Sequence, residues 1–333
     1  MTFNETDLAV FLKKYSNQEV VYCANPGNAG DALIAHATFQ LFEKLTIKLQ
    51  IIKHDEIVHD KIIFYAGGGN LVEGKYENAY YFINNNFRQN REIILLPHTV
   101  HGYDELLLSA KNLTIFCREK ISYQNLAAIG FPSERLFLAH DMAFLLSKTE
   151  FQDYLMNGKG IANCYRTDKE SARTFDMPDD NLDISLSWNG ELWHRPDFTK
   201  NVTHNLASYM STFETIKTDR LHVAILAAII GKKVELYPNN YYKIKAVFEY
   251  SIKDAFDNLV LIEDPIQNET LSAENKINEL QDKLKKLEDT LQEKEQQIAG
   301  LNTMKEQLSD VFQSKSWRIT KPLRNLISFF KKR

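Results

Sequence analysis

The sequence predicts an α/β protein with two Rossmann-like halves, a long C-terminal coiled-coil helix and a short basic amphipathic tail. Three observations support this fold class. Short apolar runs alternate with helical patterns over roughly the first 270 residues, which is typical of βαβ units and a parallel sheet. From Ile277 onward, apolar residues recur at steps of three and four, which is typical of a coiled coil. The last twenty residues then carry seven basic side chains and no acidic one.

Length and composition exclude several classes of protein. A chain of 333 residues favours about two domains, and 44% hydrophobic residues allow a sizeable core. The longest apolar run, Val223 to Ile230, has eight residues, far fewer than the ~20 that cross a bilayer. The N-terminus has no basic segment followed by an apolar stretch, so no secretory signal is predicted. Cys23, Cys117 and Cys164 lie scattered in apolar stretches and indicate reduced core thiols in a cytoplasmic protein.

The net charge of −4 is an average over three unlike segments. Residues 314–333 carry +7, residues 274–313 carry −3, and residues 1–273 carry the remaining −8. A mildly acidic body of this kind argues against general nucleic-acid binding.

The first half is predicted over residues 1–150, where strands and helices alternate. We expect strands at Glu19–Cys23, Lys61–Ala66, Ile93–Pro97 and Leu113–Cys117, and helices at Asp31–Leu45 and Lys120–Ile129. The second half is predicted over residues 151–270. We expect its strands at 161–165, 213–217 and 233–237, and its main helix at Arg220–Ile230, ended by Gly231. The halves join near residues 147–158, with a cleft between them.

The coiled coil is predicted over residues 272–313. Apolar residues fill its core positions except at Lys294 and Lys305, and Asp, Glu, Lys and Gln fill nearly every other position. This pattern favours a homo-oligomer over a helix folded back on its own body. Ile and Leu are mixed at both core positions, so the number of strands stays open.

The tail is predicted over residues 314–333. It mixes Trp317 and other large apolar residues with its seven cations, a combination suited to lipid headgroups. We expect peripheral contact with the anionic inner face of the cytoplasmic membrane. The alternative is a helix-packing tip that finishes the coiled coil.

Two glycine loops follow predicted strands and are candidates for a ligand cleft. The first contains Gly27, Asn28, Gly30 and Asp31; the second contains Gly67, Gly68, Gly69 and Asn70. Glycines let the backbone approach a ligand closely, and open α/β sheets bind ligands at the carboxyl ends of strands. The alternatives are an ordinary turn with Asp31 as helix N-cap and a flexible turn. No dinucleotide fingerprint or Walker A loop occurs, so NAD and P-loop chemistry are not indicated.

Three side chains at strand-to-helix junctions are candidates for chemistry. Arg118 offers a planar donor fork suited to carboxylate or phosphate, although a surface ion pair is the alternative. Arg220 and His222 open the most apolar helix, where a cation at the positive end of the dipole indicates a bound anion. A histidine there can act as general acid or base, and a buried structural histidine is the alternative. The remaining histidines have no ligand spacing, so no metal is predicted.

Several stretches together resemble the polysaccharide pyruvyl transferases. They are Gly27-Asn-Ala-Gly-Asp31, Tyr65-Ala-Gly-Gly-Gly69, Leu96-Pro-His-Thr-Val100, Arg118-Glu-Lys-Ile-Ser122, Asp141-Met-Ala-Phe144, Thr218-Asp-Arg-Leu-His-Val-Ala-Ile-Leu-Ala227 with Gly231-Lys-Lys-Val234, and Tyr242-Lys-Ile-Lys245. The resemblance covers roughly residues 20–255 and is most specific in the Arg-Leu-His segment.

The resemblance implies a GT-B-like arrangement and an enzyme that needs no cofactor. Its donor substrate would be phosphoenolpyruvate, whose pyruvyl group is transferred to two hydroxyls of a sugar as a cyclic ketal, with release of phosphate. His222 would be the catalytic acid/base, and Arg118, Arg220 and Leu221 would bind the donor. His98, which stands where many members have Gln, Asp141 and Lys243 would belong to the acceptor site or to its surroundings.

The tail gives a second resemblance. Residues 316–324 look like tails of bacterial capsule and O-antigen glycosyltransferases, which implies a lipid-linked acceptor in surface-polysaccharide synthesis. Two other functions stay open: a nucleotide-sugar glycosyltransferase on the same architecture, and a non-catalytic coiled-coil scaffold. The acceptor sugar is not identified.

Overall fold

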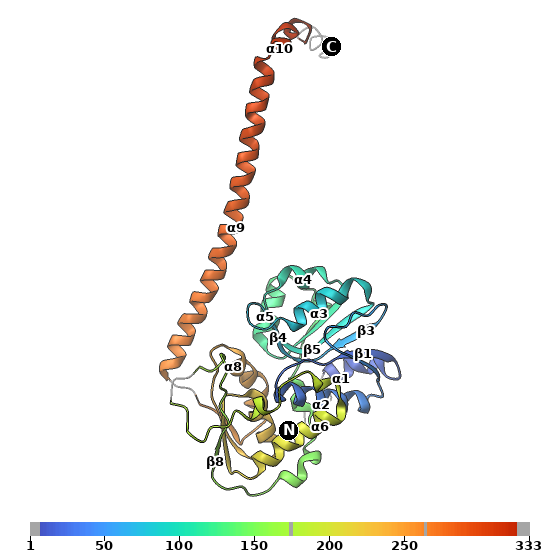
Figure 1. The fold of residues 1–333 in the computed structure, drawn as a ribbon, viewed down its shortest axis with the longest axis vertical. Helices are drawn as coiled ribbons and strands as arrows, with labels where there is room; N and C mark the ends of the chain where they lie inside the picture. Colours follow the sequence, from blue (N-terminus) through green and yellow to red (C-terminus); the bar gives the residue numbers. More distant parts are fainter. Residues whose placement is uncertain (1–6, 173–175, 263–264, 325–333) are drawn as a thin grey trace. The chain divides into compact units, whose positions relative to one another are not determined.

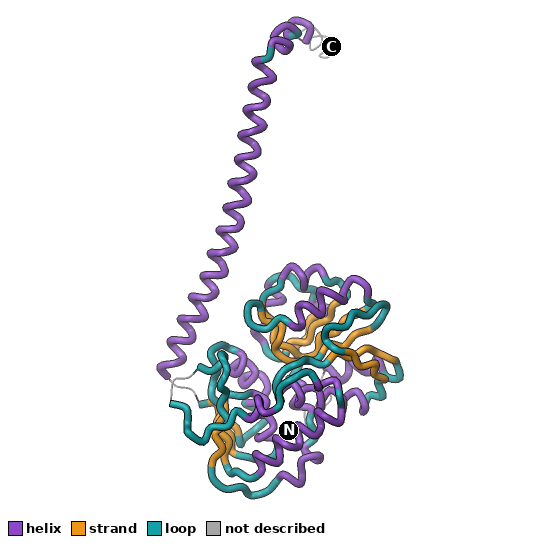
Figure 2. Tube along the Cα trace, in the orientation of Figure 1, coloured by secondary structure: helices purple, strands orange, loops and turns teal. Residues whose placement is uncertain are grey.

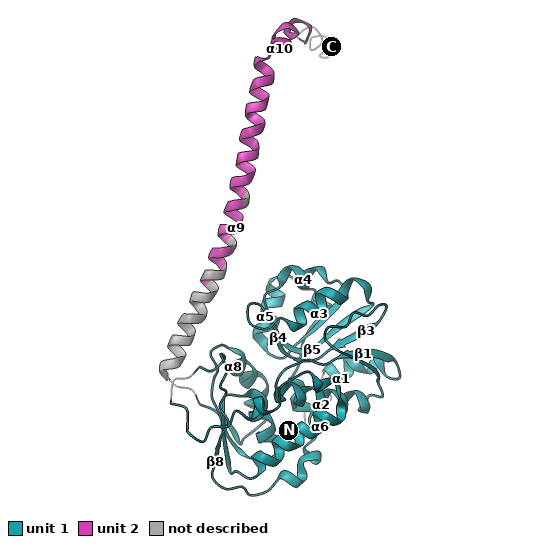
Figure 3. Ribbon diagram, viewed as in Figure 1, with its two compact units in different colours: residues 1–264 teal, residues 265–333 magenta. Residues whose placement is uncertain are grey.

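The computed structural model describes residues 7–172, 176–262 and 265–324 (Figure 1). It divides into two compact units, residues 1–264 and 265–333 (Figure 3). Within the described ranges, no helix is both long enough and apolar enough to cross a bilayer.

The first sheet of the larger unit has seven strands, all paired in parallel (Figure 2). They are β1 (Glu19–Cys23), β2 (Lys48–Ile52), β3 (Ile62–Tyr65), β4 (Gly68–Val72), β5 (Glu92–His101), β6 (Leu113–Cys117) and β7 (Leu136–Leu138). The order is β2-β1-β3-β5-β6-β7, and β4 pairs with the end of β5. The helices are α1 (Asp7–Leu12), α2 (Ala29–Lys44), α3 (Asn78–Asn86), α4 (Asp104–Ser109) and α5 (Lys120–Ala128).

The second sheet has four parallel strands in the order β11-β10-β9-β8. They are β8 (Ile161–Asn163), β9 (Thr215–Thr218), β10 (Lys233–Leu236) and β11 (Leu259–Leu261). The helices of this part are α6 (Pro196–Ser211), α7 (Leu221–Ile229) and α8 (Lys243–Val247). The chain passes from the first sheet to the second through the 3₁₀ helices at Met142–Leu145 and Lys148–Tyr154.

One hydrophobic core connects the two sheets. It includes Phe64 and Phe116 from the first sheet, Ile216 and Leu236 from the second, and the apolar faces of helices between them. Helix α2 packs against α6, and the two lie close together in Figure 1. A separate cluster under α3, α4 and α5 covers the other face of the first sheet. Because apolar surface is buried continuously between the sheets, residues 1–264 form one compact unit. The division into domains at residues 1–150 and 151–270 stays a prediction.

The sequence patterns locate seven of the eleven strands and three of the eight α-helices that the structure describes in this unit. Strands β1 and β6 have the predicted bounds, and Cys23, Cys117 and Cys164 are buried and free, as expected. Two expectations are wrong. Asn28, not Asp31, is the N-cap of α2, and Gly68 begins strand β4, so the triple-glycine segment is not a loop throughout. Parallel pairing with β5 supplies the hydrogen bonds that fix the glycines of this segment in a strand.

The smaller unit contains the long helix predicted at the C-terminus. Helix α9 spans Pro265–Gln313, and a short helix α10 follows at Lys315–Ile319. Large apolar side chains on α9 are more than half exposed, namely Leu280, Leu284, Leu287, Leu291, Ile298, Leu301, Met304, Leu308 and Phe312. The Ile277 side chain and residues 325–333 of the tail lie outside what the structure describes. The helix confirms the predicted element, whereas its pairing with another helix stays a prediction.

Candidate active site

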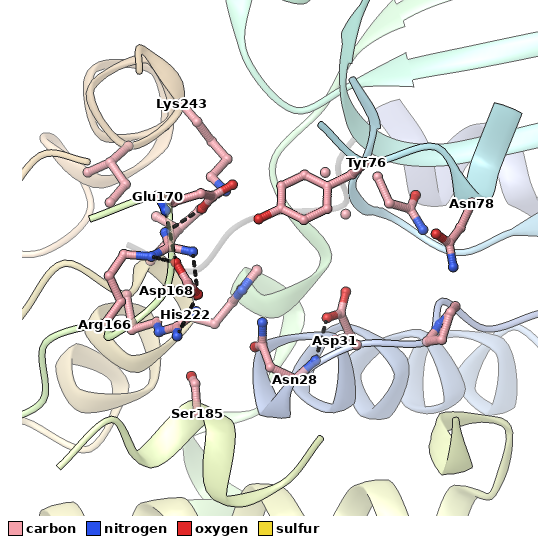
Figure 4. Close-up of a pocket in the computed structure, with 18 of the residues that line it drawn as sticks. Asn28, Asp31, Tyr76, Asn78, Arg166, Asp168, Glu170, Ser185, His222 and Lys243 are labelled. Atoms are coloured by element: carbon pink, nitrogen blue, oxygen red, sulfur yellow. Dashed lines mark hydrogen bonds and ion pairs between the residues drawn. The ribbon is translucent and has the colours of Figure 1, made fainter. Parts of the chain in front are cut away.

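A pocket of about 330 Å³ opens at the carboxyl ends of strands from both sheets (Figure 4). This is where open α/β sheets place their ligands. The first sheet contributes strand β4 and the segments that follow β1, β4 and β6, and the second sheet contributes the segments that follow β8, β9 and β10. The lining residues are Pro26, Gly27, Asn28, Asp31, Gly68, Gly69, Asn70, Tyr76, Asn78, Arg118, Arg166, Asp168, Glu170, Ser185, Arg220, Leu221, His222, Lys243 and Ile244.

The start of α2 forms one wall of the pocket through a reciprocal cap. Asn28 accepts the Gly30 N–H through its side-chain oxygen at 2.8 Å, and Asp31 accepts the Asn28 N–H at 3.1 Å. Such a capping box satisfies backbone donors that a helix start leaves open. Gly27 exchanges two backbone hydrogen bonds with Gly190 of the second half, at 2.9 and 2.8 Å. The wall is therefore fixed from both sides of the pocket.

Asp31 is an unusual carboxyl group for such a position. Burial raises the pKa of Asp31 to about 6, against the opposing effects of His222, the Asn28 N–H and Arg118. In Figure 4 it lies on the same wall as Asn28, below Tyr76. A carboxyl group with this pKa can give or take a proton near neutral pH.

His222 crosses from α7 to meet the start of α2. A Cβ added at Gly30 would lie 2.5 Å from the His222 Nδ1, so only glycine allows the ring to approach this closely. The His222 Nε2 lies 3.3 Å from the Asp141 carboxylate. The ring is thus held between the two halves, and it lines the pocket.

Arg118 is buried, with 1% of its surface exposed, and is not the surface ion pair that the sequence left open. It donates to Thr99 Oγ1 at 2.8 Å through Nε and to the Asp141 carboxylate at 2.7 Å through one terminal nitrogen. A Cβ at Gly69 would lie 2.7 Å from its other terminal nitrogen, so that glycine leaves room for the guanidinium at the wall.

Asp141 joins Arg118 and His222 from behind the pocket wall. It is fully buried and also accepts the Ala143 N–H at 2.9 Å. Burial alone would raise the pKa of Asp141, but His222 and Arg118 hold it well below its usual range. A single ionised carboxylate therefore orients one cation and one histidine toward the same cavity.

The second wall consists of paired charges, most of which the sequence patterns missed. Arg166 grips Asp168 through two hydrogen bonds of 2.8 and 3.2 Å and also pairs with Glu170. Arg220 grips Asp183 through bonds of 2.9 and 2.6 Å and reaches Asp168 at 2.9 Å. The cation at the start of α7 is thus already offset by carboxylates of the chain, so a bound anion is not required to explain it.

Lys243 extends this network from α8. Its ammonium lies 3.1 Å from Glu170, which also accepts the Tyr241 hydroxyl at 3.0 Å. Burial lowers the pKa of Lys243 to about 8, with Glu170 opposing the shift and Arg118 and Arg166 adding to it. A buried amine with this pKa can gain or lose a proton near neutral pH.

His98 lies behind the wall in β5 rather than among the lining residues. It is fully buried; its Nε2 accepts the Asn70 N–H at 3.1 Å, and its Nδ1 donates to Ala66 O at 3.2 Å. Burial, with help from Arg118, lowers the pKa of His98 to about 3, so the ring is neutral. It positions Asn70, which lines the pocket.

The structure brings most of the predicted site residues together. Those that line the pocket are Gly27, Asn28, Asp31, Gly68, Gly69, Asn70, Arg118, Arg220, Leu221, His222 and Lys243. Gly30, Gly67, His98 and Asp141 stand directly behind them. The charged lining residues that sequence reasoning missed are Arg166, Asp168 and Glu170, which follow strand β8 as a dense run of charges. These residues follow a strand of the same sheet as Arg220, and this shared position was the signal that could have found them.

The described His, Cys, Asp and Glu side chains include one group that converges closely enough to hold a metal ion. It comprises His36, Glu150 and His204, and it is separate from the residues that line the pocket. The pocket itself offers paired cations, a histidine and a high-pKa carboxyl group. These are groups that bind anions and move protons.

The chain is similar to one protein family and to two solved structures. A model of the polysaccharide pyruvyl transferase family matches residues 28–236. A crystal structure of a functionally uncharacterised protein from Klebsiella pneumoniae shares 34% identity, with a TM-score of 0.70 over 78% of this chain and 98% of that one. Anabaena HepE, in complex with UDP and glucose, shares 11% identity over 66% of this chain and 80% of that one, with a TM-score of 0.35. The comparison with curated proteins gave no match.

Proposed function

This chain belongs to the polysaccharide pyruvyl transferase family, and on that premise we propose that it transfers the pyruvyl group of phosphoenolpyruvate to a sugar. Two hydroxyls of the sugar become bridged by a cyclic ketal, and phosphate is released. The acceptor belongs to a bacterial surface polysaccharide or its lipid-linked precursor. Family membership supports a transferase that modifies polysaccharides, and the donor, the ketal and the acceptor are parts of the proposal.

The reaction requires the transfer of two protons from the hydroxyls of the sugar to other groups. One hydroxyl adds to C2 of the enol while C3 gains a proton and becomes a methyl group. The bond from C2 to the phosphate oxygen then breaks, and the second hydroxyl attacks C2. One proton ends on C3 and the other on the released phosphate, so the two steps need groups that give and accept protons near neutral pH.

One observation carries the proposal: the Asp141 carboxylate holds both Arg118 and His222 at the edge of the same pocket, at 2.7 and 3.3 Å. Arg118 is suited to the carboxylate or phosphate of the donor because its guanidinium forms paired hydrogen bonds with planar anions. His222 lies beside it as the acid that protonates C3. The shared carboxylate fixes their separation before the substrate arrives.

The opposite carboxyl group completes the proposed acid–base set. Asp31, with a pKa near 6, would accept a proton from an attacking hydroxyl while His222 delivers one to C3. Arg220 and Lys243 would stabilise the developing phosphate charge when the donor displaces part of their contact with Asp168 and Glu170.

Turnover of a defined donor tests the proposal. The protein is incubated with phosphoenolpyruvate and a panel of lipid-linked or nitrophenyl sugars, and mass spectrometry detects an added pyruvyl ketal alongside released phosphate. We expect His222→Ala to lose ~10²–10⁴-fold in rate while it stays folded. His194→Ala is the matched control, since that ring contacts a backbone carbonyl outside the pocket. Near-normal turnover by His222→Ala, or consumption of a nucleotide sugar in place of phosphoenolpyruvate, would contradict the proposal.

We further propose that the C-terminal unit assembles and locates the enzyme. The exposed leucines of α9 support self-association through a coiled coil, because a solvated helix rarely keeps such a stripe. The basic residues near Trp317 support contact with an anionic membrane surface at the cytoplasmic face.

A further inference from the structure

A second cluster of polar side chains lies where α2, the 3₁₀ helix at Lys148–Tyr154 and α6 meet. His36 Nε2 lies 2.9 Å from Glu150 Oε1, and His204 Nε2 lies 3.1 Å from the same oxygen. None of these three residues is among the described residues that line the pocket. From this geometry we propose that His36, Glu150 and His204 bind a divalent transition-metal ion, for which Zn²⁺ is the best fit.

The ligand atoms have the convergence that such an ion needs. One atom from each side chain lies within 4.8 Å of the others. Zinc bonds of about 2.0–2.2 Å to imidazole nitrogen and carboxylate oxygen separate tetrahedral ligands by roughly 3.3–3.6 Å. The rings lie 2.9 and 3.1 Å from Glu150, so a metal ion would require small outward shifts of both rings.

The types of ligand point to the kind of metal. Two imidazole nitrogens and one carboxylate oxygen suit Zn²⁺ and its first-row neighbours, whereas Mg²⁺ and Ca²⁺ prefer oxygen ligands throughout. The side chain of His36 is 6% exposed, that of Glu150 15% and that of His204 24%. The ion would therefore be shielded but reachable from solvent.

Neighbouring groups already occupy the positions of a second shell. The Tyr154 hydroxyl lies 3.1 Å from His204 Nδ1, the nitrogen that faces away from Glu150. A partner at this nitrogen fixes the ring and selects the tautomer whose Nε2 lone pair can bind a metal. Gln40, one helical turn after His36, contacts both His36 and Glu150. A rotation of its amide group would offer an oxygen as fourth ligand, and water could serve instead.

The position of the cluster indicates a structural role for the ion. His36 comes from a helix of the first sheet, Glu150 from the connection between the sheets, and His204 from a helix of the second. One ion bound to all three would tie the two halves together beside the pocket. It would also hold α2, whose first turn carries Asn28 and Asp31 at the pocket wall.

Metal analysis of the full chain, without a polyhistidine tag, tests this site. After equilibrium dialysis against micromolar Zn²⁺ we expect one ion per chain, and none after dialysis against Mg²⁺ alone. Glu150→Gln and His204→Gln should each abolish the binding at the same zinc concentration. His59→Gln is the matched control, because His59 is exposed and outside the cluster, and it should bind zinc as the natural chain does.

Two further measurements separate a built site from adventitious zinc. Tyr154→Phe keeps all three ligands and should weaken zinc binding by about 10- to 100-fold. Zinc at about 100 times its Kd should raise the Tm of the natural chain by roughly 5–10 °C and leave that of Glu150→Gln unchanged. Zinc binding that survives in Glu150→Gln and His204→Gln, or the absence of stoichiometric binding by the natural chain, would overturn the proposal.

Discussion

The pocket and the C-terminal helix depart from the usual distribution of side chains in opposite directions. At the pocket, Arg118, Asp141 and Glu170 are buried to within 3% of full burial. On α9, by contrast, Leu287 and Leu301 are 66% and 65% exposed. Buried charge and exposed leucine are both costly for an isolated chain. From this difference we propose that the pocket binds a charged ligand and that the helix binds an apolar partner.

The buried charges of the pocket and the exposed leucines of α9 also differ in how their cost is offset. In the pocket each cation lies against a carboxylate, so the charges support one another before any ligand binds. Removing one member of such a pair leaves the other unpaired in a poorly solvated place. The leucines of α9 have no such compensation along the described part of the helix, and we propose that association covers them.

The largest expected effect comes from removing the carboxylate that joins the two halves of the site. Asp141→Ala leaves Arg118 buried without its partner, which should cost about 3–5 kcal/mol of stability and eliminate most activity. Urea unfolding of the full chain measures the first effect, and the ketal assay measures the second. Glu214→Ala is the control, since its ion pair with Lys233 is exposed, and it should leave the urea midpoint unchanged. Equal midpoints for both variants would show that the pocket charges are not coupled as described.

The second effect concerns the helix and should leave the pocket untouched. Leu287→Glu with Leu291→Glu places two charges in the proposed coiled-coil seam, so the oligomer should dissociate to the 38.6 kDa chain. Light scattering during size-exclusion chromatography measures the mass. Gln292→Glu adds one such charge at an exposed neighbour outside the seam and should keep the oligomer. A natural chain that already elutes as a monomer would refute self-association.

The pocket and the C-terminal helix also differ in how well the sequence predicts them. The bounds of β1 and β6 were predicted to the residue because every residue of these strands except Glu19 is buried, which leaves a clear apolar pattern. The long helix was evident from its repeat. Arg166, Asp168 and Glu170 were missed because a run of charges ordinarily indicates a solvated loop. Their burial depends on Arg220, Asp183 and Lys243, which are far away in sequence.

The candidate metal cluster is an even clearer case of a site that the sequence does not predict. His36 and Glu150 are 114 residues apart, and Glu150 and His204 are 54 apart. Motifs for metal sites rest on ligands a few residues apart on one helix or loop. Side chains that meet only when two sheets pack together carry no local spacing, so the sequence could not reveal them.

A third prediction separates stability from function inside the pocket. The folded protein raises the pKa of Asp31 to about 6, so it holds the proton more tightly than the unfolded chain does. Ionisation of Asp31 therefore costs stability as the pH rises from about 4 to about 6, and the cost persists above that range. Asp31→Asn should remove the cost and stabilise the protein at pH 7.5 by on the order of 2 kcal/mol, with almost no gain near pH 3.5. Urea unfolding at several pH values measures this difference.

The same variant should lose activity, because an amide cannot accept the hydroxyl proton. In the natural protein kcat/KM should rise through pH 6 as Asp31 ionises, and in Asp31→Asn this limb should be absent. Glu191→Gln, an exposed change outside the pocket, controls for the loss of one charge. If the variant were more stable and equally active, Asp31 would have no part in the mechanism, and its ionisation would only lower the stability of the protein.

The smallest effect belongs to the tail, where each cation contributes weakly and only at a charged surface. Trp317 packs against Phe312 with ring centroids 4.9 Å apart, and the Arg324 guanidinium lies 3.5 Å from the Trp317 ring centroid. An aromatic residue flanked by cations favours the headgroup region of anionic lipids, at about 1 kcal/mol per basic residue. The full chain should therefore sediment with phosphatidylserine vesicles at low salt and be released as salt screens the attraction. Lys321→Glu with Arg324→Glu should reduce this binding by about tenfold or more, whereas Lys233→Glu, an exposed change on the larger unit, should not. Equal binding to neutral vesicles, or binding that salt does not weaken, would contradict the proposed attraction between the cations of the tail and anionic lipids.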